Sequence, residues 1–210
     1  MKATMDGKRI VSTLDRLFQW IMRLAAVNGL WILFTIFGLF VGGIFPATVA
    51  ALGVSRKWIM GEQELKLWKT FKQIYFQEFA GANILGWILL VVGGLLYLNY
   101  KVLAEAAGEI LFIIPFMFYL ILFFYCIIIL WTFPLLVHYK ASWFQHLRNA
   151  LIIGLSKIHY TAASGLVIVG VIFFSLEFPG MIPFFSISIA ALGCMWFSLQ
   201  IFQKMDTRVS

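Results

Sequence analysis

Three carboxylates are the side chains best suited to chemistry in this 210-residue chain. Glu105 and Glu109 are one helical turn apart, and Glu177 lies in a second short polar segment. Carboxylates beside Trp87 and Tyr97 could bind a saccharide, because aromatic faces stack on the C–H surface of a sugar ring while carboxylates accept from its hydroxyls. Paired carboxylates also act as acid and base in glycosidases, but the loop from Lys101 to Glu109 is too short to enclose a cleft. Solvated loop charges are the alternative interpretation.

The sequence carries none of the common catalytic signatures: no phosphate-binding glycine loop, His-Glu-x-x-His, Gly-x-Ser-x-Gly or dinucleotide fingerprint. His138, His146 and His159 have no i, i+4 spacing that would place two of them on one helix face as metal ligands. Cys126 and Cys194 both fall inside apolar stretches, so a disulfide framework is not indicated. We therefore expect a non-enzymatic protein with no cofactor and no metal.

The composition predicts an integral membrane protein. Hydrophobic residues make up 62% of the chain and charged residues only 12%, against roughly 25% charged in soluble domains. Mean hydropathy is +0.95, and 22 Phe, 8 Trp and 7 Tyr supply more apolar surface than a chain of this size can bury. The net charge of +7 comes from basic residues between apolar runs. It therefore reports topology, and we expect no nucleic acid partner.

Stretches free of Asp, Glu, Lys and Arg mark the elements that meet lipid. The stretch 24–55 is too long for one span and contains Gly42, Gly43 and Pro46 in its middle, where the chain is expected to turn back. In the long stretch 110–139 the prolines lie near the two ends, and no glycine interrupts it. A single long helix is therefore expected there.

Amphipathic periodicity appears in three segments outside the spans, with apolar side chains on one face and charged ones on the other. The predicted fold is all-α: a polytopic helical membrane protein with five full spans, a short returning helix and interfacial amphipathic helices on the cytoplasmic side. In chain order the elements are an interfacial helix 1–23, a span 24–41, a short returning helix 44–60, an amphipathic helix 62–79, spans 80–100 and 110–139, an amphipathic helix 142–157, and spans 158–176 and 181–203.

Basic residues predict which side of the membrane each loop occupies, because Lys and Arg of short loops stay in the cytoplasm. They are concentrated before Leu24 and in the segment that starts at Arg56 and ends at Lys72. Both segments lie on one side only if the chain between them enters the membrane and returns. Both termini are thus expected on the cytoplasmic side of a cell membrane. A five-span protein with an external N-terminus is the alternative.

Amides within the apolar stretches are expected to serve packing. An unpartnered amide in lipid is costly, so Asn28 and Asn83 should pair with each other or cap neighbouring helices. Gly42, Gly43, Pro46 and Arg56 are expected to be structural residues of the reversal.

Several short motifs are spread through the chain. The more specific ones are Asn28-Gly-Leu-Trp31, the run from Gly42 through Pro46 to Leu52, Arg56-Lys-Trp58 and Gly61-Glu62. Looser ones are Trp68-Lys-Thr-Phe71, Phe133-Pro134-Leu-Leu and Arg148-Asn149-Ala150-Leu151. Together these motifs resemble the YesL family of bacterial membrane proteins, which implies a location in the bacterial cell membrane. The resemblance implies a compact multi-pass protein linked with carbohydrate uptake and breakdown systems. It implies no catalytic residues.

The leading functional hypothesis is therefore an accessory protein of carbohydrate uptake, whose partners are the lipid bilayer and a sugar permease contacted through helices. The alternative is a sugar-binding or carrier protein with a saccharide pocket between the spans. A carrier needs a polar-lined cavity within the membrane, whereas an accessory protein should have a dry, filled core.

Overall fold

The computed structural model describes residues 2–105 and 112–209, with side chains from 13 to 105 and from 112 to 207, and all its regular elements are helices. In order they are α1 Lys2–Phe37, α2 Ile44–Ile59, α3 Leu67–Gln77, α4 Phe79–Glu105, α5 Ile113–His138, α6 Trp143–Ser156, α7 Ile158–Glu177, a π-helical turn η1 Ile182–Ser186, and α8 Ile187–Val209. The predicted all-α fold is confirmed.

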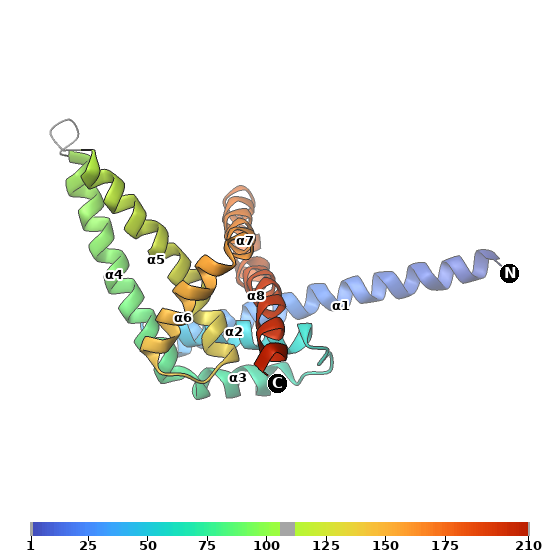
Figure 1. The fold of residues 1–210 in the computed structure, drawn as a ribbon. Helices are drawn as coiled ribbons and strands as arrows, with labels where there is room; N and C mark the ends of the chain where they lie inside the picture. The colour runs from blue at the N-terminus through green and yellow to red at the C-terminus, as the bar shows by residue number, and fades with distance from the viewer. Residues whose placement is uncertain (1, 106–111, 210) are drawn as a thin grey trace.

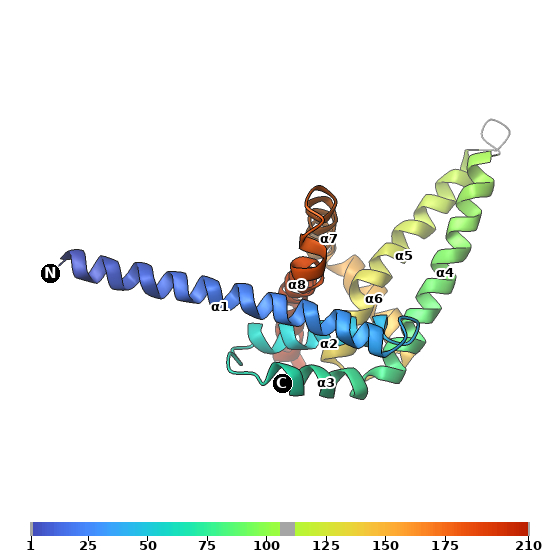
Figure 2. The ribbon, with the colours of Figure 1, turned by 180° about the vertical axis from the view of Figure 1, so that it is seen from behind.

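Five helical segments of the described chain are long and apolar enough to cross a membrane: Thr13–Phe37, Phe79–Glu105, Ile113–His138, Ile158–Glu177 and Ile182–Thr207. The protein is therefore a polytopic helical membrane protein, as predicted. Figure 1 shows α4 and α5 side by side as one hairpin, and α7 and α8 as a second. The two hairpins diverge from a shared base in which α2 and α3 lie, and α1 runs across the direction of α4 and α5 (Figures 1 and 2).

The reversal expected in the first long stretch is present between α1 and α2. Trp31 donates its indole N–H to Thr48 Oγ1 at 3.0 Å, and the rings of Trp20 and Trp58 lie 5.7 Å apart, so the two helices pack antiparallel. The segments 1–23 and 24–41, predicted as separate elements, are one continuous helix that ends at Phe37. No proline precedes Pro46, so nothing in the sequence breaks that helix earlier.

The glycines of this turn act through their size rather than through their backbone freedom. Left-handed φ angles of 54° and 60° fall on Leu39 and Phe40, whereas Gly43 is right-handed helical with φ −95°. A Cβ on Gly43 would collide with Thr35 O and would lie 2.8 Å from Thr35 Cα. The absent side chain therefore lets the start of α2 touch the backbone of α1.

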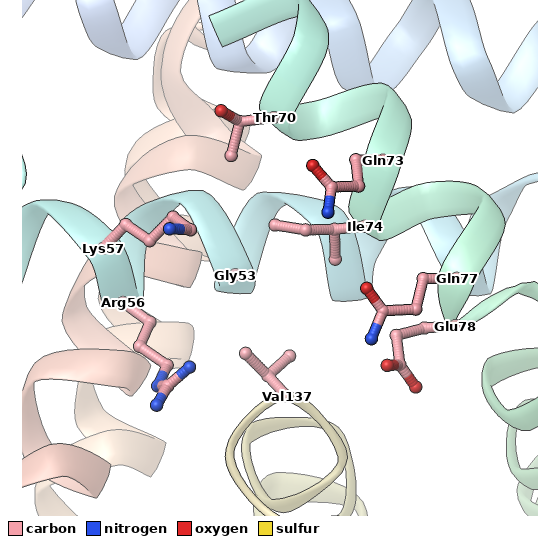
Figure 3. Close-up of a pocket in the computed structure, with 9 residues that line it drawn as sticks. All are labelled: Gly53, Arg56, Lys57, Thr70, Gln73, Ile74, Gln77, Glu78 and Val137. Atoms are coloured by element: carbon pink, nitrogen blue, oxygen red, sulfur yellow. The ribbon is translucent and has the colours of Figure 1, made fainter. Parts of the chain in front are cut away.

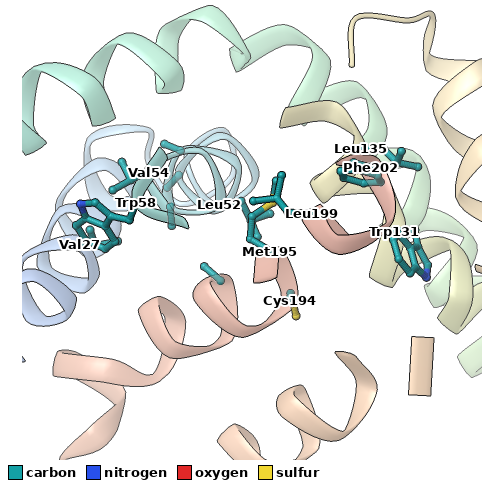
Figure 4. Close-up of a cluster of buried hydrophobic side chains, with 14 of the residues drawn as sticks. Val27, Leu52, Val54, Trp58, Trp131, Leu135, Cys194, Met195, Leu199 and Phe202 are labelled. Carbon is teal, nitrogen blue, oxygen red and sulfur yellow. The ribbon is translucent and has the colours of Figure 1, made fainter. Parts of the chain in front are cut away.

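Helix α2 is the buried centre of the fold, in contact with α1, α3, α4, α5 and α8. Small residues on its surface, Ala47, Ala50 and Ala51, are fully buried and permit close helix approach. Figure 4 shows Leu52 and Trp58 of α2 among side chains of other helices, including Val27 on α1 and Met195 on α8. The chain thus surrounds a short apolar helix with other helices.

The later elements have ends that differ from the predicted ones. Helix α5 is a single element despite Pro134 near its end. The predicted helix 62–79 is shorter, since α3 starts at Leu67. Ser142 and Gln145 form a capping box that starts α6. The predicted span 181–203 corresponds to η1 and α8, and its π-helical turn was not predicted.

Gly43→Ala tests the close approach of α1 and α2. The added methyl meets backbone rather than a flexible side chain, so we expect a loss of about 1–3 kcal/mol of stability in detergent. Gly29→Ala is the matched control, because nothing lies within 4 Å of a Cβ at that α1 position and alanine favours the helix. Equal unfolding midpoints for the two variants would contradict the packing described for the turn.

Candidate functional site

The structure does not gather the carboxylates on which a sugar site was hypothesised. Glu105 is the last residue of α4 and Glu177 the last of α7, and both are exposed. The free ends of these two hairpins point apart (Figures 1 and 2). Glu109 lies outside the described residues. Glu105 and Glu177 therefore do not share one cleft.

The two aromatic candidates have other neighbours. Trp87 packs edge-on against Phe45, with ring centroids 5.9 Å apart. The Lys101 ammonium lies 5.3 Å from the centre of the Tyr97 ring, in a cation–π contact. Ten residues of helix separate Trp87 from Tyr97, or about 15 Å. They do not form one stacking platform.

Asn28 and Asn83 both bind other elements and not each other. Asn28 is fully buried. Its amide donates to Ile182 O at 3.0 Å and accepts from Ile187 N at 3.0 Å, so it bridges two residues five apart at the π-helical turn. Asn83, on α4, donates to Gly42 O at 3.0 Å, in the turn between α1 and α2. Each amide thus bonds main-chain groups of another element, and the two amides do not pair with each other.

A polar groove lies where α2, α3 and the end of α5 meet (Figure 3). Its volume is about 240 Å³, and it is lined by Gly53, Arg56, Lys57, Thr70, Gln73, Ile74, Gln77, Glu78 and Val137. Gly53, Ile74 and Val137 supply an apolar floor. The other six bring hydroxyl, amide, carboxylate and cationic groups from two helices and the residue that follows α3.

Most polar groups of this groove are unused by the protein. Among the described residues, the side chains of Thr70, Gln73, Gln77 and Glu78 make no hydrogen bond. Lys57 is paired with Glu62 at 2.7 Å, whereas Arg56 and Glu78 line different walls (Figure 3) and form no ion pair with each other. Burial raises the pKa of Glu78, and the nearby Lys140 partly offsets that rise. The groove thus offers donors and acceptors to a polar ligand.

Sequence reasoning identified only Arg56 among these residues, and as a structural one. A detectable signal was present, because Thr70, Gln73 and Gln77 are three or four residues apart and share one face of α3. That uncharged polar stripe borders the lysines of the same helix. The opposing wall from α2 follows only from the tertiary contacts.

Arg56 also belongs to a hydrogen-bonded chain, here called the base network, that joins α2, α5 and α8. Arg56 Nε donates to His138 Nδ1 at 3.0 Å. The other ring nitrogen of His138 lies 3.2 Å from Asp206 Oδ2, and the Tyr139 hydroxyl donates to Asp206 Oδ1 at 2.8 Å. Because Arg56 can only donate, His138 carries its proton on Nε2 and donates it to Asp206.

The other two histidines are not brought to this network. His146 is buried in α6, and burial lowers its pKa. His159 is exposed near the start of α7. Within the described part of the chain, no three His, Cys, Asp or Glu side chains gather closely enough to hold a metal ion.

An apolar cleft of about 260 Å³ opens between the two hairpins. Leu130 and Phe133 of α5 form one wall, and Ala190, Ala191 and Cys194 of α8 form a wall of small residues. The one hydroxyl among its lining residues, that of Thr48, already accepts from Trp31 and donates to Ile44 O at 2.8 Å. The cleft therefore offers almost nothing that could replace the water around a sugar.

Comparisons with known proteins point to one family. Residues 24–100 match the family model described as "Protein of unknown function, DUF624". Three proteins of Bacillus subtilis (strain 168) are similar over most of their length. YteU is 36% identical over 91% of this chain and 86% of its own, YesV is 29% identical over 90% of each, and YesL is 29% identical over 95% and 94%. No solved structure matches the chain.

Tyr139→Phe tests the base network. Loss of the hydroxyl should cost about 0.5–1.5 kcal/mol. Burial and the bond to Asp206 raise the pKa of Tyr139 to about 12, against 10 in an ordinary tyrosine. The hydroxyl therefore stabilises the fold fully below pH 10, and this contribution is lost as the pH rises from 10 towards 12.

The check is thermal unfolding in detergent at neutral pH and at about pH 11, where the difference between wild type and Tyr139→Phe should shrink. Tyr119→Phe is the control, since it removes an exposed hydroxyl that makes no hydrogen bond within the described residues. A Tyr139→Phe variant as stable as wild type would contradict the network.

Proposed function

The chain belongs to the DUF624 family, to which the YesL-like membrane proteins belong, and from that premise we propose that it is a non-enzymatic accessory protein of carbohydrate uptake. Its action is to hold a partner membrane protein, such as a sugar permease, through helix contacts. The carbohydrate link rests on the YesL-family resemblance. The mode of action rests on the apolar cleft between the hairpins.

The cleft is the single observation that carries this mode of action. Membrane helices associate through close packing against small residues, because there is no hydrophobic driving force for their association within lipid. The α8 wall of Ala190, Ala191 and Cys194 is of that kind, and the larger Leu130 and Phe133 face it from α5. A bulky apolar side chain from a partner's spanning helix would enter this cleft of about 260 Å³.

The same observations speak against the rival carrier. A transported sugar needs polar groups along its route within the membrane, but the cleft is lined almost wholly by carbon. The polar groove lies instead at the base, beside α3 and the end of α5. For an enzyme, the outer carboxylates would have to converge, and the two hairpin ends that carry Glu105 and Glu177 point apart.

Co-purification in mild detergent from the native host tests the proposal. A sugar permease subunit should be recovered with the wild type. Ala190→Trp, which fills the cleft, should reduce its recovery by about tenfold or more, since overpacking costs about 1–3 kcal/mol. Val92→Trp on the exposed surface of α4 is the matched control. Sugar uptake by liposomes that contain this protein alone would overturn the accessory role in favour of a carrier.

We also propose that the protein resides in the bacterial cell membrane with both termini cytoplasmic. The support is the density of Lys and Arg before Leu24 and around α3, together with the return of the chain at the α1–α2 turn. An inner face rich in basic residues also suits anionic lipid headgroups.

Cysteine labelling in whole cells tests this sidedness, in a Cys126→Ser background because Cys126 is exposed. Lys8→Cys and Lys69→Cys should react only after the cytoplasm is opened. Lys101→Cys, at the far end of α4, should react from outside. Labelling of Lys8→Cys in intact cells would replace this topology with five spans and an external N-terminus.

A further inference from the structure

The residues exposed at the base of the fold are of the types that proteins place at the level of lipid headgroups. Aromatic side chains are exposed there: Trp68 and Phe76 on α3, and Trp143 and Phe144 at the start of α6. Exposed Trp beside lysine is typical of the membrane–water interface, because the ring is apolar and its N–H is polar. The polar groove opens within this layer, between α3 and the end of α5.

Opposite charges line the two sides of the groove without neutralising each other. Lys57 is already paired with Glu62, which leaves Arg56 as the cation of one wall and Glu78 as the anion of the other (Figure 3). Lys140 acts on Glu78, and Arg56 acts on Asp206, but Lys140 and Asp206 are both exposed. Arg56 and Glu78 are half-buried and form no ion pair, so a ligand that carries both signs is favoured over one that carries either.

Arg56 is held in position for an anion. Its Nε is fixed by His138 Nδ1 at 3.0 Å, and among the described residues its two terminal nitrogens have no protein partner. Two parallel N–H groups of a fixed guanidinium match two oxygens of a phosphate. The base network thus orients Arg56 and leaves its fork free.

A sugar fits this groove less well. Saccharide sites use aromatic faces against the ring, and no aromatic residue is among those that line the groove. The floor of Gly53, Ile74 and Val137 suits a short run of methylene groups. The amides of Gln73 and Gln77 and the Thr70 hydroxyl, on one face of α3, supply further hydrogen bonds at the edge.

We propose that the groove binds a phosphoethanolamine headgroup, with the phosphate against Arg56 and the ammonium against Glu78. The ethylene link between the two charged groups lies over the apolar floor. The headgroup of the membrane lipid phosphatidylethanolamine has this chemistry, and so does a soluble phosphoethanolamine ester. This site is separate from the apolar cleft, so its failure leaves the proposed partner contact untouched.

Native mass spectrometry of the full chain, stripped of lipid in detergent, tests the proposal. Phosphatidylethanolamine should occupy one saturable site, about tenfold more tightly than phosphatidylglycerol, which has no ammonium for Glu78. Glu78→Gln should weaken phosphatidylethanolamine by about tenfold and remove the preference. Glu64→Gln, a change of an exposed carboxylate outside the groove, should leave both lipids unchanged.

Arg56→Lys gives the second readout, because it keeps the charge but loses the fork and the bond to His138. It should weaken both lipids alike, and a parallel thermal unfolding curve identifies any loss of folded protein. Competition by glycerophosphoethanolamine separates a soluble source from a lipid source, and binding of either one supports the proposal. Equal retention of the two lipids by wild type, or an unchanged preference in Glu78→Gln, would overturn it.

Discussion

The rest of the structure depends on the contact between Gly43 and the backbone of α1 at Thr35. A chain that reverses inside an apolar stretch must satisfy its own backbone groups, since lipid supplies no hydrogen-bond partners. It does so here: the N–H of Phe40 donates to Thr35 O and that of Gly42 to Gly38 O, and Asn83 donates to Gly42 O from α4. Leu39 and Phe40 take left-handed conformations, at a cost of about 1–2 kcal/mol each. Packing along α2 offsets that cost.

Because α2 lies at the centre, the side chains at its C-terminal end reach several elements together. Arg56 contacts the end of α5 and, through His138, the C-terminal part of α8. Lys57 contacts the loop before α3 through Glu62. The two hairpins are thus joined at their base by polar contacts and diverge at their other ends (Figure 1). This arrangement separates an apolar cleft between the hairpins from a polar groove beneath them.

The two surfaces suit different partners for the same reason. Carbon walls and small residues favour another helix, because dispersion and close approach are what membrane helices gain on association. Unpaired polar groups at the interface favour a small charged ligand, because they can regain the hydrogen bonds that they lose with water. A protein with both features holds a partner in the bilayer and a headgroup at its surface, and neither role requires chemistry on the bound molecule.

The sequence by itself determined the class of protein, the number of long apolar helices and the place of the reversal, because these follow from the lengths of apolar stretches and the residues that interrupt them. It also indicated that Asn28 and Asn83 serve packing, since an amide among apolar residues must find a partner. It did not determine which partner: Asn28 bridges Ile182 and Ile187, more than 150 positions away. Only the tertiary structure decided that Glu105 and Glu177 lie apart and that Arg56 and Glu78 share a groove. Both facts depend on the angles at which helices cross. These angles are set by contacts between residues far apart in the sequence, and no periodic pattern in the sequence reports them.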